Sequence, residues 1–449
     1  MFAAPQPARV HPWRTAFAAA ALAILCVAAL QPVFLGSLYA VRQYTDLDPI
    51  RKHIVAAFDA GVLGEDEVPR QLIHRFGHQF TECAALHLSI DDEQDTLKAV
   101  LMPQLQGPYV GPCGELAKTA RGIATAERTD YSRYWHGYRL WLWPMLEHVG
   151  VDTMRFINAA FVAAALALFF VALCQTLGAT PGLILFAVLF SLTDIWRIWR
   201  ITPHWISMIV ILAGSAAFAL MHRRIRNDYA AIVAAAALGA IFNFVDFLIN
   251  PPMMPMFLSF FVLAIGMREP SQRASLAPIP LAVLVALGWF GGYSVTWAAK
   301  WALALWFTSD VGATWSDIAG QIALRLYGQE KDGPVRIIPL WPTIQMIAKS
   351  FVSGGVLFVA VIAAAVFVHV RRHWDSFDKR RYLILMAPTL IPIAWFEALN
   401  NHTQTHQNFT YRSEAAAIAI MFAVLLIASS VPATPRELWE GLKASFRRD

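Results

Sequence analysis

Long apolar runs, separated by short polar stretches, occupy most of the chain. A run of about 20 apolar residues crosses the hydrocarbon core of a bilayer as one helix, and a helix satisfies its own backbone hydrogen bonds there. Ten runs fit this description, although the third and sixth are short. The predicted spans are 15–38, 153–177, 181–196, 203–222, 229–249, 253–267, 277–303, 347–370, 382–398 and 413–432. We therefore predict an all-α polytopic membrane protein with about ten transmembrane helices.

Basic residues predict how these spans are oriented. Lys and Arg accumulate in short cytoplasmic loops, and here they fall at alternate connections, as expected if both termini are cytoplasmic. The basic positions are Arg9, Arg14, Arg223, Arg224, Arg226, Arg268, Arg273, Arg371, Arg372, Lys379, Arg380, Arg381 and those from Arg436 to Arg448. The first run follows basic residues, as a signal peptide does, but its length and the poor cleavage site near Tyr39 favour a retained anchor.

This topology divides the 449 residues into alternating regions. We expect a cytoplasmic N-terminus and first span at 1–38, a large helical extracytoplasmic loop at 39–152, spans two to seven at 153–303, a second extracytoplasmic loop at 304–346, spans eight to ten at 347–432 and a cytoplasmic tail at 433–449. Shorter extracytoplasmic segments are expected at 197–202, 250–252 and 399–412. No room remains for a large separate catalytic domain.

Composition agrees with this class. The chain is 57% hydrophobic and 15% charged, and its mean hydropathy is +0.49, which is typical of a lipid-facing helical bundle. The net charge of +5 follows from the basic cytoplasmic segments, so it does not indicate a nucleic-acid partner.

Cysteine usage supports an extracytoplasmic first loop. Cys26 and Cys174 fall within spans, whereas Cys83 and Cys113 share the first outer loop, in a compartment that permits disulfides. We predict a bridge between Cys83 and Cys113, with two free thiols as the alternative. Closing a loop of roughly 30 residues would stabilise the fold by about 3 kcal/mol.

Two carboxylates follow the first span directly. Asp46 and Asp48 stand in the stretch YTDLDP, at the outer surface of the membrane, where a carboxylate can act as a general base, bind a metal or cap a helix. Since Pro49 follows, one of the two is expected to cap a helix starting at Ile50. Which one is left for chemistry stays open. The acidic cluster DDEQD at 91–95 is interpreted as a solvated surface without chemistry.

The stretch TDYSRYWHGYRLWLWPML at 129–146 mixes aromatic and basic residues before the second span. Aromatic residues near a span commonly form an interface belt, but a belt does not explain the Arg133, His136 and Gly137 set among them. Gly137 permits close backbone approach or an unusual dihedral angle. The Arg and His beside it can bind a phosphate or a sugar hydroxyl.

Asp246 stands near the outer end of the fifth span, shortly before Pro251 and Pro252. A carboxylate in hydrocarbon costs about 3 kcal/mol, so we expect it to face a polar cavity or to bond to a neighbouring helix. Single Arg and Lys residues near helix ends often only snorkel, but a common depth of many polar residues predicts one polar cavity in the outer half of the membrane. The other residues at this depth are Asp194, Arg197, Arg200, His204, Lys300, Arg325, Glu397 and Arg412.

The most polar segment within the apolar part of the chain is NNHTQTHQNFTYR at 400–412. It holds three Asn, two Gln, two His and one Arg, and no aliphatic side chain. Sugars and phosphates are recognised by dense hydrogen bonding, so we interpret the segment as part of a binding site. The alternative is a polar turn between two spans, for which thirteen residues are more than needed.

Taken together, these features resemble the GT-C superfamily of polyprenyl-phosphate-sugar glycosyltransferases. More narrowly, YSRYWHGY, FVDFLINPP, the Trp297–Lys300–Trp301 segment and NHTQTHQNFTYR resemble bacterial membrane proteins related to pilin and cell-wall D-arabinofuranosyltransferases. The resemblance covers most of the chain in order and topology. It departs from the superfamily pattern at the acidic pair, here Asp-Leu-Asp, and at His136-Gly137-Tyr138, where His-Pro-Pro is common.

The resemblance implies an enzyme of the bacterial inner membrane whose active site faces away from the cytoplasm. It would transfer a sugar from polyprenyl phosphate to a protein or glycan acceptor by inverting displacement, with Asp46 or Asp48 as the base. Phosphate-binding residues would be Arg412, His402, His406, Lys300, Arg200 and Tyr411. Residues for the sugar or acceptor would be Arg133, Tyr134, His136, Asp246, Asn250 and Asn401. Dependence on a divalent metal stays open, because no strong ligand spacing is present.

Two other classes of function fit parts of the same pattern. A transporter or flippase of a lipid-linked sugar would place polar groups near the midplane and often contains repeated halves, whereas this sequence has no evident repeat and its cytoplasmic half-spans are plainly apolar. A non-catalytic assembly partner would tolerate loss of Asp46, Asp48 and Asp246. Polarity confined to one side of the membrane favours the enzyme.

Overall fold

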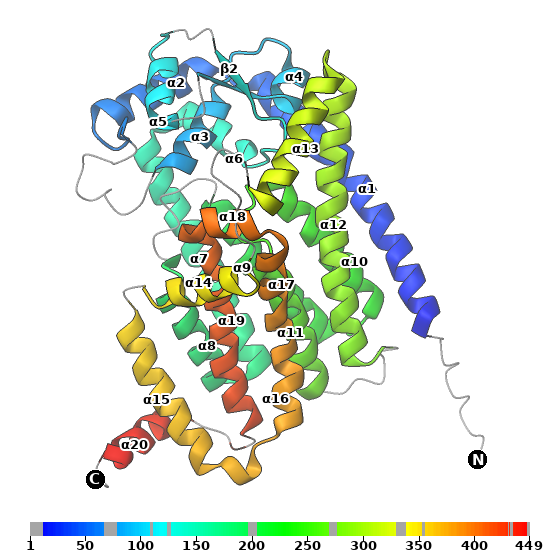
Figure 1. Cartoon of the computed structure of the whole chain (residues 1–449), viewed down its shortest axis with the longest axis vertical. Coiled ribbons are helices and arrows are strands. Elements are labelled where there is room, and N and C mark those ends of the chain that lie inside the picture. The colour runs from blue at the N-terminus through cyan, green and yellow to red at the C-terminus, as the bar shows by residue number, and fades with distance from the viewer. Residues whose placement is uncertain are drawn as a thin grey trace.

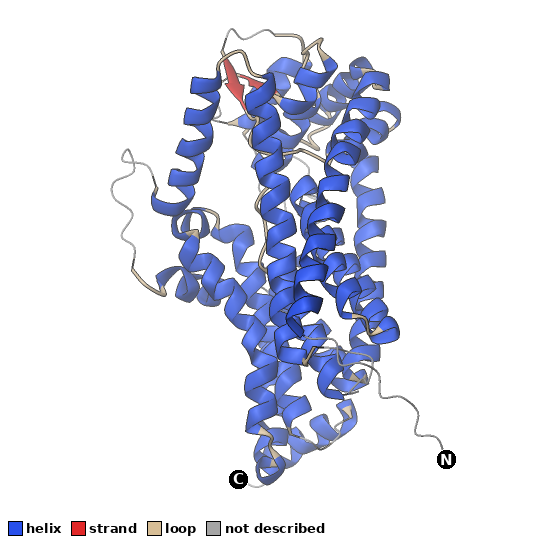
Figure 2. Cartoon of the chain, turned by 90° about the vertical axis from the view of Figure 1, so that its right-hand side faces the viewer, coloured by secondary structure: helices blue, strands red, loops and turns tan. Residues whose placement is uncertain are grey.

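The computed structural model describes residues 12–66, 79–107, 111–123, 127–195, 204–268, 276–328, 338–352, 355–429, 431 and 434–446. Almost all of this part of the chain is helical (Figure 2). Its regular strands are β1 (Gln104–Gln106) and β2 (Arg128–Asp130), which pair antiparallel with Gln104 opposite Asp130. The predicted all-α class is therefore confirmed.

Six helices in the described ranges are long and apolar enough to cross a membrane. They are α1 (Pro12–Tyr44), α7 (Val151–Leu177), α9 (His204–Ile225), α10 (Asp228–Val245), α12 (Pro278–Phe307) and α19 (Gln407–Ala428). Two shorter apolar helices, α8 (Ala179–Leu192) and α11 (Met253–Arg268), lie among them. These helices run roughly along the long axis of the molecule (Figure 1), as expected for a helical membrane protein.

Two predicted spans are not single helices. The prediction of one helix over 347–370 is wrong, because α14 (Trp341–Ser350) ends before α15 (Val356–Arg372) begins, and α14 lies across the bundle beside α19 (Figure 1). Likewise, 382–398 is divided into α16 (Lys379–Met386), the 3₁₀ turn η5 (Ala387–Thr389) and α17 (Leu390–Ala398). Pro388 lies in that turn, and proline removes a backbone donor and disrupts a continuous α-helix.

The region predicted as the first outer loop folds over one end of the bundle. Besides β1 and β2 it contains α2 (Leu47–Asp59), α3 (Phe80–Ser89), α4 (Thr96–Leu101), α5 (Pro112–Ala120) and α6 (Arg139–His148), all in the upper part of Figure 1. The expected second outer loop contains α13 (Val311–Tyr327), which descends beside α12 (Figure 1). The short 3₁₀ turn η4 (Trp374–Ser376) lies between α15 and α16, and α20 (Pro435–Phe446) lies at the opposite end of the molecule (Figure 1).

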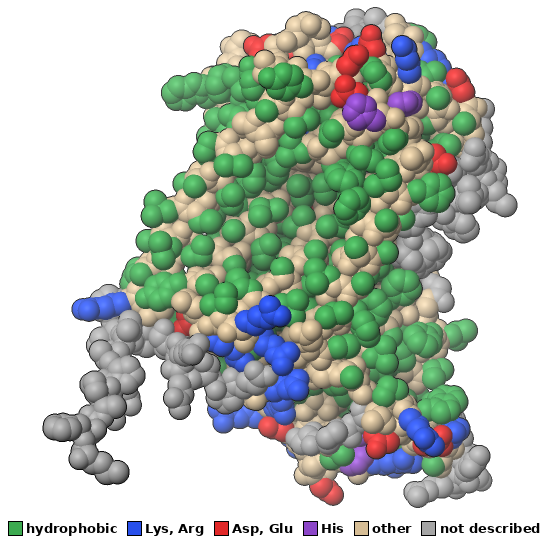
Figure 3. Space-filling model, turned by 180° about the vertical axis from the view of Figure 1, so that it is seen from behind, with side chains coloured by type: hydrophobic (Ala, Val, Ile, Leu, Met, Phe, Trp, Pro, Cys, Tyr) green, Lys and Arg blue, Asp and Glu red, His purple; other side chains and the backbone are tan. Residues whose placement is uncertain are grey.

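Charged side chains divide between the two ends of the molecule. Figure 3 shows a broad apolar band, with a large group of Lys and Arg and some acidic side chains below it, and acidic, basic and His side chains above it. The basic last turns of α9, with Arg223 and Arg224, and of α15, with Arg371 and Arg372, contribute to this pattern.

Small residues bring α10 and α12 into close contact. A Cβ atom on Gly239 would overlap the Trp289 carbonyl oxygen, and one on Gly292 would overlap the Ala236 carbonyl oxygen. Close approach of backbones over small residues is a common way for membrane helices to pack. Both helices also contact α1, so these three form one side of the bundle.

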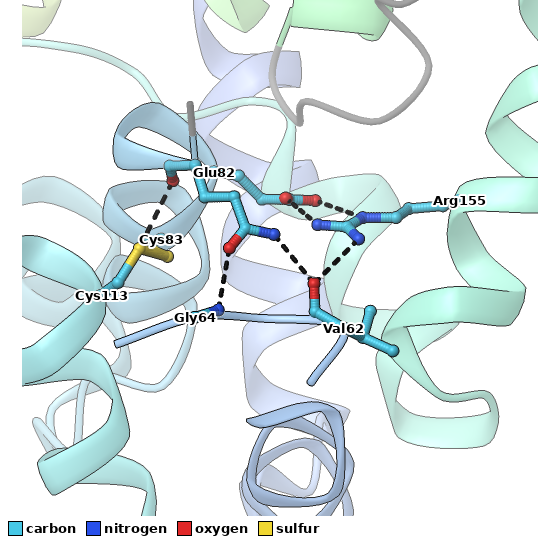
Figure 4. The surroundings of a disulfide bond; sticks show 7 residues. Val62, Gly64, Glu82, Cys83, Cys113 and Arg155 are labelled. Carbon is cyan, nitrogen blue, oxygen red and sulfur yellow. Dashed lines mark hydrogen bonds and ion pairs between the residues drawn. A yellow bond between two sulfur atoms is a disulfide. The ribbon is translucent and has the colours of Figure 1, made fainter. Parts of the chain in front are cut away.

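The outer region is cross-linked and anchored to α7 (Figure 4). Cys83 of α3 and Cys113 of α5 form a disulfide bond, as predicted. One residue before Cys83, the Glu82 carboxylate forms a buried ion pair with Arg155 of α7, with Arg155 Nε to Glu82 Oε1 at 3.1 Å. Arg155 Nη1 also donates to the Val62 carbonyl oxygen at 3.4 Å. The pair therefore fixes the outer region to the bundle.

Glu82→Ala is expected to lower the free energy of unfolding by about 3–5 kcal/mol, because it leaves the Arg155 charge buried without its partner. Asp92→Ala breaks the exposed pair with Arg128 and should cost less than about 1 kcal/mol. Reversible unfolding of the purified protein in detergent measures both changes. Equal effects of the two substitutions would contradict the anchoring role of Glu82.

Candidate functional site

Polar segments from distant parts of the sequence meet between the outer region and the bundle. We call this the polar layer and define it as the 131–138 loop, the 246–250 turn, α13 and residues 400–412. In Figure 1, α18 (Asn400–Thr405) lies at this level, below the outer helices and beside the lower end of α13. Of the candidate residues, the polar layer contains Arg133, Tyr134, His136, Asp246, Asn250, Asn401, His402, His406, Tyr411 and Arg412.

Residues 400–412 are helical, which excludes the simple polar turn that was the alternative interpretation of this segment. The segment forms α18 and the first turns of α19. Local bonds explain how so polar a sequence holds a helix: Gln404 Nε2 donates to Asn400 Oδ1 at 2.6 Å, and Thr410 Oγ1 donates to the His406 carbonyl oxygen at 2.9 Å. Polar side chains at a spacing of four residues face each other on a helix.

His402 and Asn401 tie α18 to its neighbours. His402 Nε2 lies 3.0 Å from the Leu248 carbonyl oxygen in the 246–250 turn, and Asn401 Nδ2 donates to the Leu324 carbonyl oxygen at 2.6 Å in α13. Burial holds the pKa of His402 well below its usual value. A neutral ring that donates from Nε2 keeps Nδ1 as an acceptor, so His402 suits a sugar hydroxyl better than the phosphate to which the sequence assigned it.

Asp246 stabilises the turn that follows α10. Its Oδ1 accepts a hydrogen bond from Ser207 Oγ of α9 at 2.9 Å, and the Ile249 backbone N–H donates to its carboxylate at 3.1 Å. Asn250, with its amide nitrogen turned toward α19, donates to the Phe409 carbonyl oxygen at 2.8 Å. Asp246 therefore bonds to a neighbouring helix, the second of the two alternatives that its sequence position left open.

The 131–138 loop packs onto the same turn. His136, at a φ of 57°, places Nε2 2.9 Å from the Tyr131 carbonyl oxygen and Nδ1 3.2 Å from the Tyr138 hydroxyl oxygen. Burial holds the pKa of His136 well below its ordinary value, so its ring is neutral. The Gly137 N–H donates to the Phe244 carbonyl oxygen at 2.8 Å, the close backbone approach that the sequence predicted at this glycine.

Aromatic and basic side chains link this loop to α12 and α13. Arg325 Nη2 donates to the Tyr134 hydroxyl oxygen at 2.6 Å, and the Tyr134 ring stacks on Trp297 with centroids 6.1 Å apart. The Arg133 carbonyl oxygen accepts bonds from the indole nitrogens of Trp297, at 2.8 Å, and Trp301, at 3.2 Å. Trp297 and Trp301 of α12 therefore orient the 131–138 loop.

Arg412 and Tyr411 lie at the start of α19. The Arg412 Nε donates to the Thr193 carbonyl oxygen, just beyond α8, at 2.9 Å. Its guanidinium lies 5.4 Å from the centroid of the Tyr411 ring and is only 7% exposed. Nearby, His406 packs against Phe409, and burial together with Arg325 lowers the pKa of His406 to about 4.

The described part of the chain leaves several buried polar atoms of the polar layer and its rim without a hydrogen-bond partner. These include Arg412 Nη1, both ring nitrogens of His204, which begins α9, and Oδ2 of Asp317 in α13. His204 packs edge-on against Phe409, with centroids 5.2 Å apart. An unpartnered buried donor or acceptor costs about 1–3 kcal/mol, so these atoms indicate where a ligand would bind.

Lys300 lies at the edge of the polar layer, but its side chain bonds to the outer region. Its Nζ donates to the carbonyl oxygen of Leu101, the last residue of α4, and the side chain is fully buried. A cation at a helix C-terminus is favoured by the helix dipole. Lys300 therefore uses at least one donor structurally instead of presenting it to a phosphate. Arg200 and Arg197 lie outside the described residues.

Asp46 and Asp48 lie on the exposed surface of the outer region. Asp46 caps α2, and its Oδ1 accepts from the Asp48 backbone N–H at 3.0 Å. The Asp48 carboxylate lies 3.5 Å from Arg51 Nη1 and is 74% exposed. Capping by one of the two was predicted, although the helix begins at Leu47 instead of Ile50. Among the hydrogen bonds and ion pairs of the described residues, none joins either carboxylate to the polar layer.

A different carboxylate, that of Asp317 in α13, lies within the polar layer. Asp317 is half-buried, and its electrostatic neighbours are Arg133, Asp130 and Arg325. Burial raises the pKa of Asp317 above its usual value. Sequence reasoning missed Asp317, although a signal was present: Asp317, Gln321 and Arg325 recur every four residues, which places them on one face of a helix.

Dependence on a divalent metal was left open by the sequence. Within the described ranges, no three His, Cys, Asp or Glu side chains converge in a way that could hold a metal ion.

Gly137→Ala is expected to destabilise the 131–138 loop, because a Cβ atom there would lie 2.5 Å from the Phe244 ring and carbonyl oxygen. Such overpacking typically costs about 1–3 kcal/mol. Gly291→Ala is the matched control: nothing lies within 4 Å of its added Cβ, so helix propensity should leave stability unchanged or up to about 1 kcal/mol higher. Thermal unfolding in detergent compares them, and the idea fails if Gly137→Ala melts like the parent chain.

Comparison of the chain with protein-family models, with curated proteins and with solved structures found no match. The functional argument therefore depends on the polar layer itself.

Proposed function

We propose that this protein is an integral-membrane glycosyltransferase that moves a sugar from a polyprenyl-phosphate donor to an acceptor hydroxyl. The observation that carries the proposal is the polar layer, in which Arg412, Arg325 and buried histidines meet directly above apolar membrane helices. A lipid-linked donor needs both environments, because its tail requires an apolar surface and its phosphate requires positive charge and hydrogen-bond donors. D-arabinofuranose is the proposed sugar, by the sequence resemblance.

The arrangement of polar groups favours an enzyme over a transporter. Arg325 lies within electrostatic range of His402 and His406 on one side and of Asp317 on the other. These groups collect at one end of the bundle, whereas a transporter would bind its substrate near the midplane and open to both sides. By the distribution of Lys and Arg, we place this end outside the cytoplasm, in a bacterial inner membrane.

The proposed reaction is a single inverting displacement. The acceptor oxygen forms a bond to the anomeric carbon, the bond from that carbon to the phosphate oxygen breaks, and its electron pair leaves with polyprenyl phosphate. The acceptor proton passes to a carboxylate. Arg412, held at the Thr193 carbonyl oxygen, stabilises the charge that develops on the phosphate. The remaining acceptor of His402 and the Asn401 side chain contact sugar hydroxyls.

Asp317 is the carboxylate best placed to act as the base. It lies among Arg133, Asp130 and Arg325 within the polar layer, one of its oxygens is buried and unpartnered, and its raised pKa strengthens it as a proton acceptor. Asp46 and Asp48, the base candidates of the sequence pattern, are solvent-exposed and engaged with their own helix. The two assignments make opposite predictions for mutants.

Purified protein in lipid nanodiscs, supplied with radiolabelled polyprenyl-phosphate D-arabinofuranose and an alkyl glycoside acceptor, tests the proposal. Asp317→Asn is expected to reduce the transfer rate by at least about 100-fold, the usual contribution of a general base. The double variant Asp46→Asn/Asp48→Asn should retain transfer, and so should the control Asp375→Asn, whose exposed carboxylate lies in η4 at the other end.

The outcomes separate the two assignments. Loss of transfer in the double variant, with Asp317→Asn active, would identify Asp46 or Asp48 as the base. Absence of transfer from any lipid-linked pentose to any acceptor by the parent protein would overturn the glycosyltransferase proposal.

A further inference from the structure

We infer that the Arg412 guanidinium and the His204 imidazole together bind one phosphate group, the head of a prenyl-phosphate lipid. Naming the lipid rests on the proposed function, which it deepens by assigning His204, a residue that the sequence pattern left without a role. Three features support it: buried donors without a partner among the described residues, the nearby start of α9, and the apolar surface beside them.

Both side chains have hydrogen-bonding capacity that the described chain does not use. His204 is 5% exposed and Arg412 is 7% exposed. Among the described residues, neither ring nitrogen of His204 has a hydrogen-bond partner, and neither does Arg412 Nη1. A neutral imidazole offers one N–H donor, and the guanidinium offers further N–H donors with a fixed positive charge. A ligand that satisfies these atoms must be rich in acceptors and is favoured if it is negative.

The two groups lie near each other. His204 lies within electrostatic range of Arg412 and His406, and its ring packs against Phe409, three residues before Arg412. Asp194 lies within range of Arg412 and partly balances its charge. The Glu414 carboxylate, also on α19, is buried, and no charged group among the described residues interacts with it.

The local backbone also favours an anion. Within the described residues, α9 begins at His204. The first backbone N–H groups of a helix lack intrahelical acceptors, and the helix dipole places partial positive charge there. A phosphate at this position would accept bonds from side chains and face the positive helix end.

Apolar surface lies next to the same position, which points to a lipid instead of a free phosphate. Thr193, which holds Arg412, directly follows α8, and Phe190 one turn earlier is 37% exposed. The start of α15 contacts α8 here, because a Cβ on Gly355 would lie 2.5 Å from the Ser191 carbonyl oxygen. Leu357 and Phe358, which follow Gly355, are 82% and 55% exposed. A prenyl chain can lie along these side chains while its phosphate reaches Arg412.

The test is a binding experiment that needs no sugar transfer. Farnesyl phosphate, farnesol and inorganic phosphate are titrated separately into the full-length protein in detergent, and calorimetry measures each affinity. Farnesyl phosphate is expected to bind, inorganic phosphate to bind at least 10-fold more weakly, and farnesol not to compete with farnesyl phosphate. His204→Gln and Arg412→Gln should each weaken farnesyl phosphate binding at least 10-fold, and Arg412→Lys should retain part of it.

The exposed residues His148 and Arg224 provide matched controls, as His148→Gln and Arg224→Gln, which should bind like the parent. If a variant does not fold, the parent decides: farnesyl phosphate should raise its melting temperature and farnesol should not. Equal binding of farnesol and farnesyl phosphate, equal affinity of inorganic phosphate and farnesyl phosphate, unchanged binding in both Gln variants, or no binding by the parent each overturns the inference. Binding without sugar transfer overturns only the proposed function, whereas transfer that persists in both Gln variants overturns only this assignment.

Discussion

The turn after α10 is the constraint on which the polar layer depends. Leu248 holds a φ of 65°, a conformation that costs a non-glycine residue about 1–3 kcal/mol. Two bonds hold the turn in this shape: the Ile249 N–H donates to Asp246, and the Leu248 carbonyl oxygen accepts from His402. Next to them, the Phe244 carbonyl oxygen receives the Gly137 N–H. One short turn therefore positions the 131–138 loop, α9 through Ser207, and α18.

This constraint separates polar residues that hold the site together from those that remain available to a ligand. Asp246, His136 and Lys300 are buried and bonded to atoms of the chain itself. Buried polar groups of this kind are stable only when they are paired, so their contacts explain their presence without a substrate. Arg412, His204 and Asp317 retain unpartnered atoms. Candidate ligand-binding residues are therefore distinguished by the hydrogen bonds that their atoms already form. Residue type alone does not reveal these bonds.

The sequence predicted the features that depend on local pattern. Apolar runs long enough to cross a bilayer became α1, α7, α9, α10, α12 and α19; Cys83 and Cys113 form their bridge; and Gly137 makes its close backbone approach. The helices at 400–412 were missed because hydrophobic periodicity was the signal used, and a segment without aliphatic residues has none. The run at 347–370 was misassigned because α14 is an amphipathic helix that merges in sequence with the apolar α15.

Placement of the carboxylates could not be predicted in the same way. Asp46 and Asp48 were favoured because they follow a span, but whether a carboxylate faces a site depends on how the outer helices fold back, which is a long-range property. α13 descends from the end of α12 to contact α18, and this brings Asp317 and Arg325 to Arg133 and Tyr134, nearly 200 residues earlier in the chain. Only the topology makes these residues neighbours.

The position of Arg412 follows from the ends of two helices. Its Nε bonds to the Thr193 carbonyl oxygen at the C-terminus of α8, where the helix dipole favours a cation. α9, which begins at His204, presents the opposite end of a helix dipole, where an anion is favoured. The guanidinium is held at the first end, and its Nη1, which has no hydrogen-bond partner among the described residues, lies near the second. Because its orientation is set before any ligand arrives, the proposed phosphate binding would require little reorganisation, which is the property that makes fixed donors effective toward a developing negative charge.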